Sequence, residues 1–430
     1  MPRDDYAGEF DPDFELSHLS RQGLAVLGRE YMLSGQLQDR SAMPMVLGRL
    51  GVDARIGIAI DEWMSASPLY SARMQRALQF SGTDIGTLFK NLQLDIGFSH
   101  SYMHVGYRLE NERYGEFWLD CCGALMDVEP FGEDMVRGMC HDIEDPTFDA
   151  TAAATNPLIK IRPIHRPPRS PADLEPHCRW KVFIDDAPNA EPFEMHPNLA
   201  TVSGSKLADV ALVDPGVDAE PGGRANYTDA FDPDFTLEDL SHRALVLTVQ
   251  EFAVQCHVLC RSFLLTMSQR LPEDELRGVA AAQWTGSAGL TAERLRAAMR
   301  IDGTDAAAIA KLFQLHPSFH PRTYVDTRVD VLDDQRVRLS LGPSPAFEEG
   351  DALSWPAHLD EDDAHPAIDA IARVGNPRAR AHPVPAGDAH RSWEIVIDPS
   401  AKPSPEPADV AMTRSSTGAT AVNMPRRRVR

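Results

Sequence analysis

The sequence predicts an α+β fold that occurs twice, as two homologous repeats packed into a pseudo-dimer. The first observation is a repeated segment, Phe-Asp-Pro-Asp-Phe, which occupies residues 10–14 and again residues 231–235, an offset of 221 (231 − 10). The second is that each copy passes from helix-type to strand-type spacing of its apolar residues. A period this long exceeds that of solenoid repeats and fits a duplicated domain of ordinary size.

The third observation is that further residue pairs keep their order along both copies. They share the offset until small deletions intervene, and include Trp63 and Trp284, Gly82 and Gly303, Lys90 and Lys311, Asn156 and Asn376, and Trp180 and Trp393. Because order and spacing are kept together, chance explains the match poorly.

The copies define the expected domain boundaries. We place the first repeat at residues 10–185 and the second at 230–398. Residues 186–229, rich in Pro, Gly, Asp and Ala, are expected to be a linker. The tail 399–430 is rich in Pro, Ser, Thr and Ala and is expected to be disordered.

Within the first copy, helices come before strands. Apolar residues at spacings near three and four predict helices across residues 16–32 and 47–63. Ser67 followed by Pro68 has the pattern of a helix start, as an N-cap residue with proline at the first helical position. About four helices are therefore expected before the first strand.

The rest of each copy is predicted as a β-hairpin, a helix and a second antiparallel strand pair. In the first copy these are strands at 103–109 and 117–121, a helix over 133–155, and strands at 159–164 and 179–184. In the second copy they are strands at 325–331 and 337–341, a helix over 367–374 and a last strand at 393–397. Both copies give the same order of elements.

Composition limits the classes of partner. The chain has 430 residues, 43% hydrophobic and 25% charged, as globular proteins do. Its net charge of −22 disfavours nucleic acid and anionic membranes, which would repel it. No apolar run predicts a signal peptide or a membrane span, so a cytoplasmic protein with six reduced cysteines is expected. The excess of Arg over Lys and the many alanines suggest a bacterial source. Assembly with itself or with partner subunits stays open.

The chemically distinctive residues occur in the first copy only. Three doublets combine cysteine with a second soft or borderline ligand or another cysteine: Cys121-Cys122, Cys140-His141 and His177-Cys178. The aligned residues of the second copy, 341–343, 360–361 and 390–391, contain no cysteine. Packing thiols would be replaced by small apolar residues, whereas Asp360, Glu361 and Arg391 are charged. The pattern indicates a functional unit kept in one copy and lost in the other.

Strand alternation indicates which cysteines face the interior. Cys178 shares a face with Trp180 and therefore points inward. At the first doublet the alternation favours Cys121 as the inward residue, but strands often end at such a point, so Cys122 turning inward is the alternative. Acids that can orient a histidine or protonate a leaving group follow Cys140: Asp142, Glu144 and Asp145.

These features resemble a known superfamily, the one containing L-2-amino-thiazoline-4-carboxylic acid hydrolase and the 4-vinyl reductase-like ligand-binding domains. The resemblance covers roughly residues 14–185 and rests on Cys122 or Cys121, the run CHDIED from Cys140, and the run HCRWKVFI from His177. It implies a small-molecule site. The glycine that such proteins tend to have before the last cysteine is replaced here by residues 175–177, and the second copy departs at every cysteine.

Three hypotheses follow. In the first, the protein is a hydrolase that opens a cyclic C–N bond, with Cys140 or a metal-bound water as nucleophile, His141 or His177 as base, and one of the acids Asp142, Glu144 and Asp145 as acid or orienting group. In the second, it is a non-catalytic binding, sensory or scaffold subunit in which zinc is held by Cys122, Cys140 and Cys178, with His141, His177 or His165 as the fourth ligand, beside a pocket for an apolar ligand. In the third, buried thiols simply pack the core of a scaffold subunit.

Overall fold

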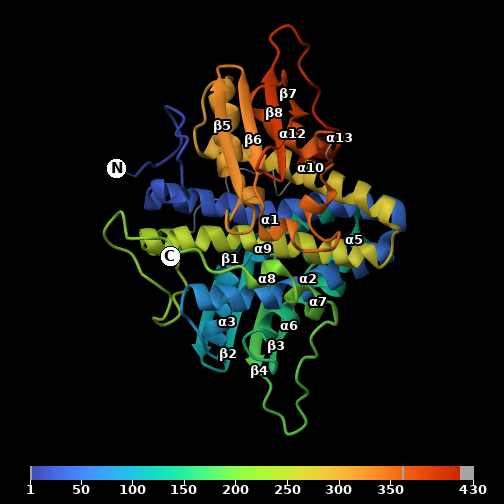
Figure 1. Cartoon of the computed structure of the whole chain (residues 1–430). Coiled ribbons are helices and arrows are strands. Elements are labelled where there is room, and N and C mark those ends of the chain that lie inside the picture. Colours follow the sequence, from blue (N-terminus) through green and yellow to red (C-terminus); the bar gives the residue numbers. More distant parts are fainter. Residues whose placement is uncertain (1, 361–362, 417–430) are drawn as a thin grey trace.

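Two four-stranded sheets lie at opposite ends of the molecule, with long helices between them (Figure 1). The computed structural model describes residues 2–360 and 363–416. The sheets have equivalent antiparallel strand orders, β1-β2-β4-β3 and β5-β6-β8-β7. The predicted α+β fold of two repeats is therefore confirmed.

The elements follow the predicted order in both copies. The first contains α1 Arg21–Leu50, α2 Val52–Ala77, α3 Ile85–Gln93, β1 Met103–Asn111, β2 Tyr114–Cys122, α4 Gly123–Val128, α5 Glu133–Arg137, a π-helical segment Gly138–Ile143, α6 Glu144–Ala153, β3 Ile159–His165 and β4 Cys178–Ile184. The connecting segment contains α7 Asn198–Ser203 and α8 Lys206–Asp209. The second copy contains α9 His242–Ser268, α10 Glu273–Ala298, α11 Ala306–Leu315, β5 Thr327–Asp333, β6 Arg336–Leu341, α12 Pro366–Gly375, β7 Ala379–Pro383 and β8 Arg391–Ile397, and α13 Ala408–Arg414 follows it.

The long helices pack mainly across the repeats rather than within them. Helix α1 lies along α10 and α9, and α2 lies along α9, whereas the contacts of α1 with α2 and of α9 with α10 are fewer. Buried apolar residues of α1 and α9, such as Leu27 and Phe252, belong to one hydrophobic cluster. The centre of the molecule is thus a core that both repeats share, which makes the chain a pseudo-dimer.

The segment before each long helix crosses to the other repeat. The hydroxyl of Tyr6 donates to Gln314 Oε1 at 2.7 Å, and the hydroxyl of Tyr227 donates to Gln93 Oε1 at 2.8 Å. Because both members of each pair differ by 221, the two crossing arms make the same contact in opposite directions. Tyr227 lies in the expected linker, so the structural repeat begins before residue 230.

Both connecting segments contain short helices. The expected linker, residues 186–229, carries α7 and α8, which pack on α9. In the tail expected to be disordered, residues 408–414 form α13, and residues 417–430 lie outside the described residues. Val410 of α13 is 2% exposed and sits against Gly289, where a Cβ would come within 2.5 Å of it. Thr413 is also buried, and Arg414 forms an ion pair with Glu293 at 2.6 Å. Such specific contacts have no compositional signature.

The predicted helix start at Ser67 is also wrong, because Pro68 lies inside α2. Helix α2 packs on both α9 and α6 along its length, and this tertiary packing outweighs the local start signal.

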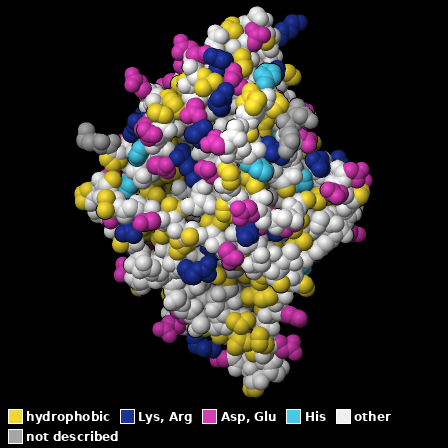
Figure 2. All heavy atoms as spheres, in the orientation of Figure 1, with side chains coloured by type: hydrophobic (Ala, Val, Ile, Leu, Met, Phe, Trp, Pro, Cys, Tyr) yellow, Lys and Arg dark blue, Asp and Glu magenta, His cyan; other side chains and the backbone are white. Residues whose placement is uncertain are grey.

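The molecular surface mixes both signs of charge. On the face seen in Figure 2, acidic and basic side chains are interspersed and basic ones form no continuous patch. In the part of the chain that the structure describes, no helix has both the length and the apolar character needed to cross a membrane.

Candidate functional site

A bulge at the end of β2 decides which cysteine of the first doublet is buried. His104 of β1 pairs with Cys121, but the next residue, Val105, pairs with Leu119, so Asp120 is an extra residue in β2. An extra residue reverses the alternation of side chains beyond it. Cys122 is therefore the buried member, at 3% exposure, and Cys121 is half-buried.

The three predicted thiols share one hydrophobic cluster behind the first sheet. Cys122 ends β2, Cys140 lies in the π-helical segment and Cys178 begins β4. The inward orientation predicted for Cys178 is confirmed by its 5% exposure. The carboxyl group of Glu144 is close enough to interact electrostatically with all three thiols.

This environment keeps the thiols protonated. Burial, and then the charges of Glu144 and of the neighbouring thiols, raise the pKa of Cys140 far above its ordinary value. Burial and Glu144 likewise raise the pKa of Cys122 to about 12. Since a thiolate is the nucleophilic form, Cys140 is not activated as a nucleophile in this arrangement.

The predicted histidine partners of the thiols are engaged with the backbone. The ring nitrogen Nε2 of His141 lies 2.7 Å from the carbonyl oxygen of Pro167, and Nε2 of His165 lies 2.9 Å from that of Pro176. His177 Nδ1 accepts a hydrogen bond from the backbone N–H of Cys122 at 3.3 Å, and burial lowers the pKa of His177. In these positions the histidines stabilise loops.

The remaining predicted acids separate into different environments. Asp142 is exposed, and Asp145 forms an ion pair with Arg166 at 2.5 Å. Only Glu144 turns into the interior. Among residues 2–360 and 363–416, no three His, Cys, Asp or Glu side chains are grouped so that they could hold a metal ion. The zinc site therefore stays a prediction of the sequence.

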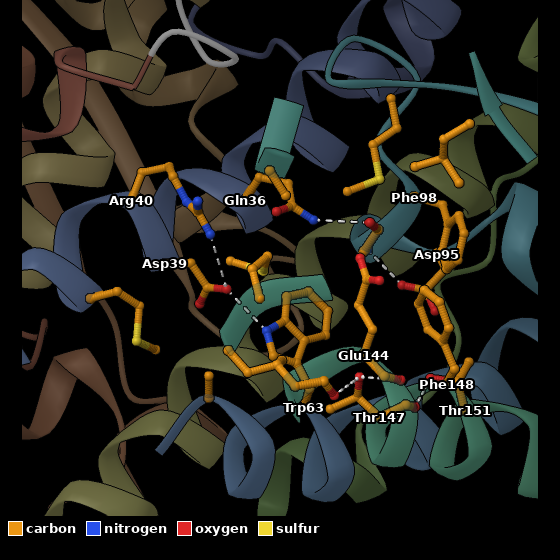
Figure 3. A pocket seen from close by; sticks show the side chains of 18 of the residues that line it. Gln36, Asp39, Arg40, Trp63, Asp95, Phe98, Glu144, Thr147, Phe148 and Thr151 are labelled. Carbon is orange, nitrogen blue, oxygen red and sulfur yellow. Dashed lines mark hydrogen bonds and ion pairs between the residues drawn. The ribbon is translucent and has the colours of Figure 1, made fainter. Parts of the chain in front are cut away.

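Glu144 also lines a pocket of about 110 Å³. The walls come from α1, α2, the β1–β2 end of the first sheet, the π-helical segment and α6 (Figure 3). Its apolar lining includes Met43, Ala59, Phe98, Leu119, Ile143 and Phe148, and its polar lining includes Gln36, Asp39, Arg40, Arg55, Tyr70, Asp95 and Glu144. An engineered cavity of about 150 Å³ holds one benzene molecule, so this pocket has room for a small organic group.

The two arginines of the pocket differ in their partners. Arg40 lies 3.4 Å from Asp127 and 3.9 Å from Asp39. Arg55 is 5% exposed, yet its Nε and Nη2 atoms have no hydrogen-bond partner in the described part of the chain. Burial, and then the charge of Arg40, lower the pKa of Arg55. An unpaired buried guanidinium is costly and uncommon.

The acids of the pocket differ in their partners. Asp39 accepts a hydrogen bond from Trp63 Nε1 at 3.0 Å through Oδ2, and its carboxyl group also hydrogen-bonds with the buried carboxyl group of Glu62. Burial and the neighbouring Asp39 raise the pKa of Glu62 well above its ordinary value. Oε2 of Glu144 has no partner among the described residues, and burial raises the pKa of Glu144 to about 8. Unpartnered atoms of Arg55 and Glu144 thus line one cavity.

Asp95 lines the pocket with a carboxylate that accepts two hydrogen bonds through Oδ1. It accepts from the hydroxyl of Tyr70 at 2.8 Å and from the backbone N–H of Gly97 at 2.7 Å. Burial raises the pKa of Asp95 to about 6 despite these hydrogen bonds.

The second repeat has the same site in a closed form. A cavity of about 30 Å³ is lined by residues equivalent to those of the first pocket, including His257, Cys260, Trp284 and His316. Trp355 stacks on Trp284 at a ring distance of 4.2 Å and also lines this cavity, and His365 packs on the same indole at 4.5 Å. Aromatic side chains fill much of the space that is open in the first repeat.

Sequence reasoning found Glu144 and the thiols but missed Arg55, Asp39 and Asp95. The sequence does contain a signal for these three residues, because the equivalent residues of the second copy, 221 positions later, are Leu276, Cys260 and His316. Each pair differs in charge, whereas the sequence prediction rests on the doublets in which the second copy has no cysteine.

No protein-family model, curated protein or solved structure matches this chain. The resemblance to the thiazoline hydrolase and 4-vinyl reductase-like superfamily therefore stays a prediction, and the function has to be argued from the site itself.

Proposed function

We propose that the protein binds a small organic molecule in the pocket of its first repeat, while the second repeat contributes the other half of the shared core. One observation carries this proposal: the pocket contains the buried, unpartnered guanidinium of Arg55. A buried charge without a partner costs several kcal/mol. A ligand that supplies the partner explains why the fold tolerates it.

The second repeat supports the proposal by contrast. Its equivalent of Arg55 is Leu276, and its pocket is largely filled by Trp355. The same fold thus exists with a neutral, occupied core at this place, so the charged opening in the first repeat is not a requirement of folding.

Ligand-induced stabilisation tests the proposal. A library of small acids, amines and neutral compounds should contain members that raise the melting temperature, because a ligand at 100 times its Kd adds about 2.7 kcal/mol to stability. Ala59→Leu adds three carbon atoms to the pocket wall and should abolish the effect. Ala54→Leu, on the same helix but outside the pocket, is the matched control. Equal stabilisation of both variants would contradict binding at this site.

A second candidate, hydrolysis of a C–N bond, is favoured by Glu144. A carboxyl group with a pKa of about 8 is protonated at neutral pH and is suited to donate a proton to a leaving group. If the protein is such an enzyme, Glu144→Gln should abolish turnover of a bound ligand while its affinity changes less than tenfold. Turnover that survives in Glu144→Gln would exclude this role.

Zinc bound by the thiols is also a proposal. Metal binding would require Cys122, Cys140 and Cys178 to lose their protons. Elemental analysis of wild type, Cys140→Ser and the half-buried control Cys121→Ser tests it. About one zinc per chain, lost only in Cys140→Ser, would support the site, and a metal-free wild type would contradict it.

A further inference from the structure

We infer that the ligand of the first repeat is a small organic acid that also carries a hydrogen-bond donor, as a small amino acid does. This inference rests on the proposed function and specifies its ligand. The ligand class follows from the pocket atoms that lack a hydrogen-bond partner and from the apolar side chains that line the space between those atoms.

The anionic group of the ligand is assigned to Arg55. Its unpartnered atoms, Nε and Nη2, form one edge of the guanidinium plane, the edge that holds a carboxylate through two parallel hydrogen bonds. Elsewhere in the molecule, Arg73 uses this edge to bind Glu251, with Nε···Oε2 at 2.9 Å and Nη2···Oε1 at 2.8 Å. Both of those side chains are almost fully buried. Arg55 therefore presents the same donors without a carboxylate among the described residues.

Gly138 of the π-helical segment packs close to this edge. A Cβ at Gly138 would lie 3.1 Å from Ile56 Cδ1 and 3.4 Å from Arg55 Nη2. A side chain at this position would therefore crowd the guanidinium group.

The donor group of the ligand is assigned to the acidic part of the wall. Oε2 of Glu144 is buried without a hydrogen-bond partner in the described ranges, and Glu144 and Asp39 line the pocket with Arg55. The carboxyl group of Glu144 is protonated at neutral pH in the free protein. An ammonium group on the ligand would favour the ionised form of Glu144 and donate a hydrogen bond to it.

The body of the ligand is apolar and small. Side chains of Met43, Phe98 and Ile143 contribute to the lining between the polar groups. With a cavity of about 110 Å³, short aliphatic side chains fit the space better than larger groups do.

Matched sets of compounds test the assignment. One set is valine, 3-methylbutanoate, 2-methylpropylamine and 3-methylbutanamide, and the other is alanine, propanoate, ethylamine and propanamide. Binding to the full-length protein is measured by calorimetry and by thermal shift. We expect the amino acid of at least one set to bind at least tenfold more tightly than its acid-only and amine-only analogues, since a charge-assisted hydrogen bond contributes about 1.5–3 kcal/mol.

Variants connect this preference to the residues. Arg55→Gln should weaken the acids at least tenfold and leave the amines unchanged, and Arg55→Lys, which keeps the charge but loses the paired donors, should lie between. Arg137→Gln, which removes an exposed arginine of α5, is the control and should bind as wild type does.

The failures are distinguishable. If neutral amides bind as tightly as the amino acids, or if Arg55→Gln binds acids normally, the ligand class is wrong while a small-molecule site remains. If no compound of any charge class stabilises the wild type, the proposed function is contradicted and this inference with it.

Discussion

The two repeats share a fold and an interface but differ in the pocket between their long helices and their sheet. The differences fall at equivalent positions: Asp39 and Cys260, Arg55 and Leu276, Glu62 and Gln283, and Asp95 and His316. Charged side chains line or adjoin the first pocket, whereas those of the second are neutral. After duplication, only one copy of such a site has to keep its binding or catalytic residues, so the pocket of the other copy can be filled by packed side chains.

The packing of the second copy shows how a pocket is closed. Trp355 is 4% exposed and stacked on Trp284. His316 is neutral, and its Nε2 lies 3.2 Å from the carbonyl oxygen of Ala288. The residues described as lining the second cavity are all neutral, whereas the lining of the first pocket contains the unpartnered guanidinium edge of Arg55. The following predictions test this contrast.

Removing the indole ring of Trp355 from the second pocket should cause the largest change in the free energy of unfolding. Trp355→Ala removes a buried ring and should lower the free energy of unfolding by roughly 3 to 5 kcal/mol, measured by denaturant titration. Phe131→Ala in the first repeat, where the ring is 74% exposed, is the control and should change it by less than about 0.5 kcal/mol. Similar small effects of both changes would show that Trp355 does not fill the second pocket.

Asp95 and His316 should give opposite dependences of stability on pH. Burial raises the pKa of Asp95 to about 6, so its contribution is present below its ordinary pKa near 4 and is lost as pH rises through 6. Burial lowers the pKa of His316 to about 3, so its contribution is present above 6.5 and is lost as pH falls toward 3.

Unfolding titrations between pH 4 and pH 7.5 separate the two. The stability of wild type relative to Asp95→Asn should fall by an amount on the order of 3 kcal/mol as pH rises across this range. Relative to His316→Gln it should rise with pH. Parallel curves for wild type and both variants would contradict the effect of burial on the pKa values of these two groups.

Neutralising the first pocket should stabilise the protein without ligand. Arg55→Leu installs the residue of the second repeat and removes an unpaired buried charge, which should raise the free energy of unfolding by roughly 1 to 3 kcal/mol. Arg49→Leu, at a half-exposed arginine of α1, is the control and should have little effect. A destabilised Arg55→Leu would mean that Arg55 already has a partner in the free protein.

The smallest expected effect is a difference in the rates at which the thiols are alkylated, and it does not involve a change in stability. At pH 7.5, iodoacetamide should modify Cys121 first, because Cys122, Cys140 and Cys178 are buried and protonated. Mass spectrometry of partly modified protein measures the order, and urea-unfolded protein is the control in which all react alike. A single fast thiol at Cys140 would instead favour the nucleophile hypothesis.

The sequence predicted the fold because its signals are local and occur twice. The order of elements followed from periodicity, and the inward Cys178 followed from strand alternation. The choice between Cys121 and Cys122 depended on a bulge, which only the pairing with β1 reveals. Arg55 was missed because a charge on a helix reads as a solvated residue until its burial is known. The crossing arms were missed because the alignment of the copies does not say which copy each arm touches.

The crossing arms determine when each contact can form while the chain is being synthesised. Tyr6 finds its partner Gln314 only after 308 further residues have been made, which at ribosomal speeds takes roughly 15 to 60 s. Until then the first repeat has no docking place for its own arm, although the arm of Tyr227 can reach Gln93 as soon as residue 227 has been made. A stretch of apolar surface is therefore exposed during synthesis, and the two halves reach their final form together rather than in order.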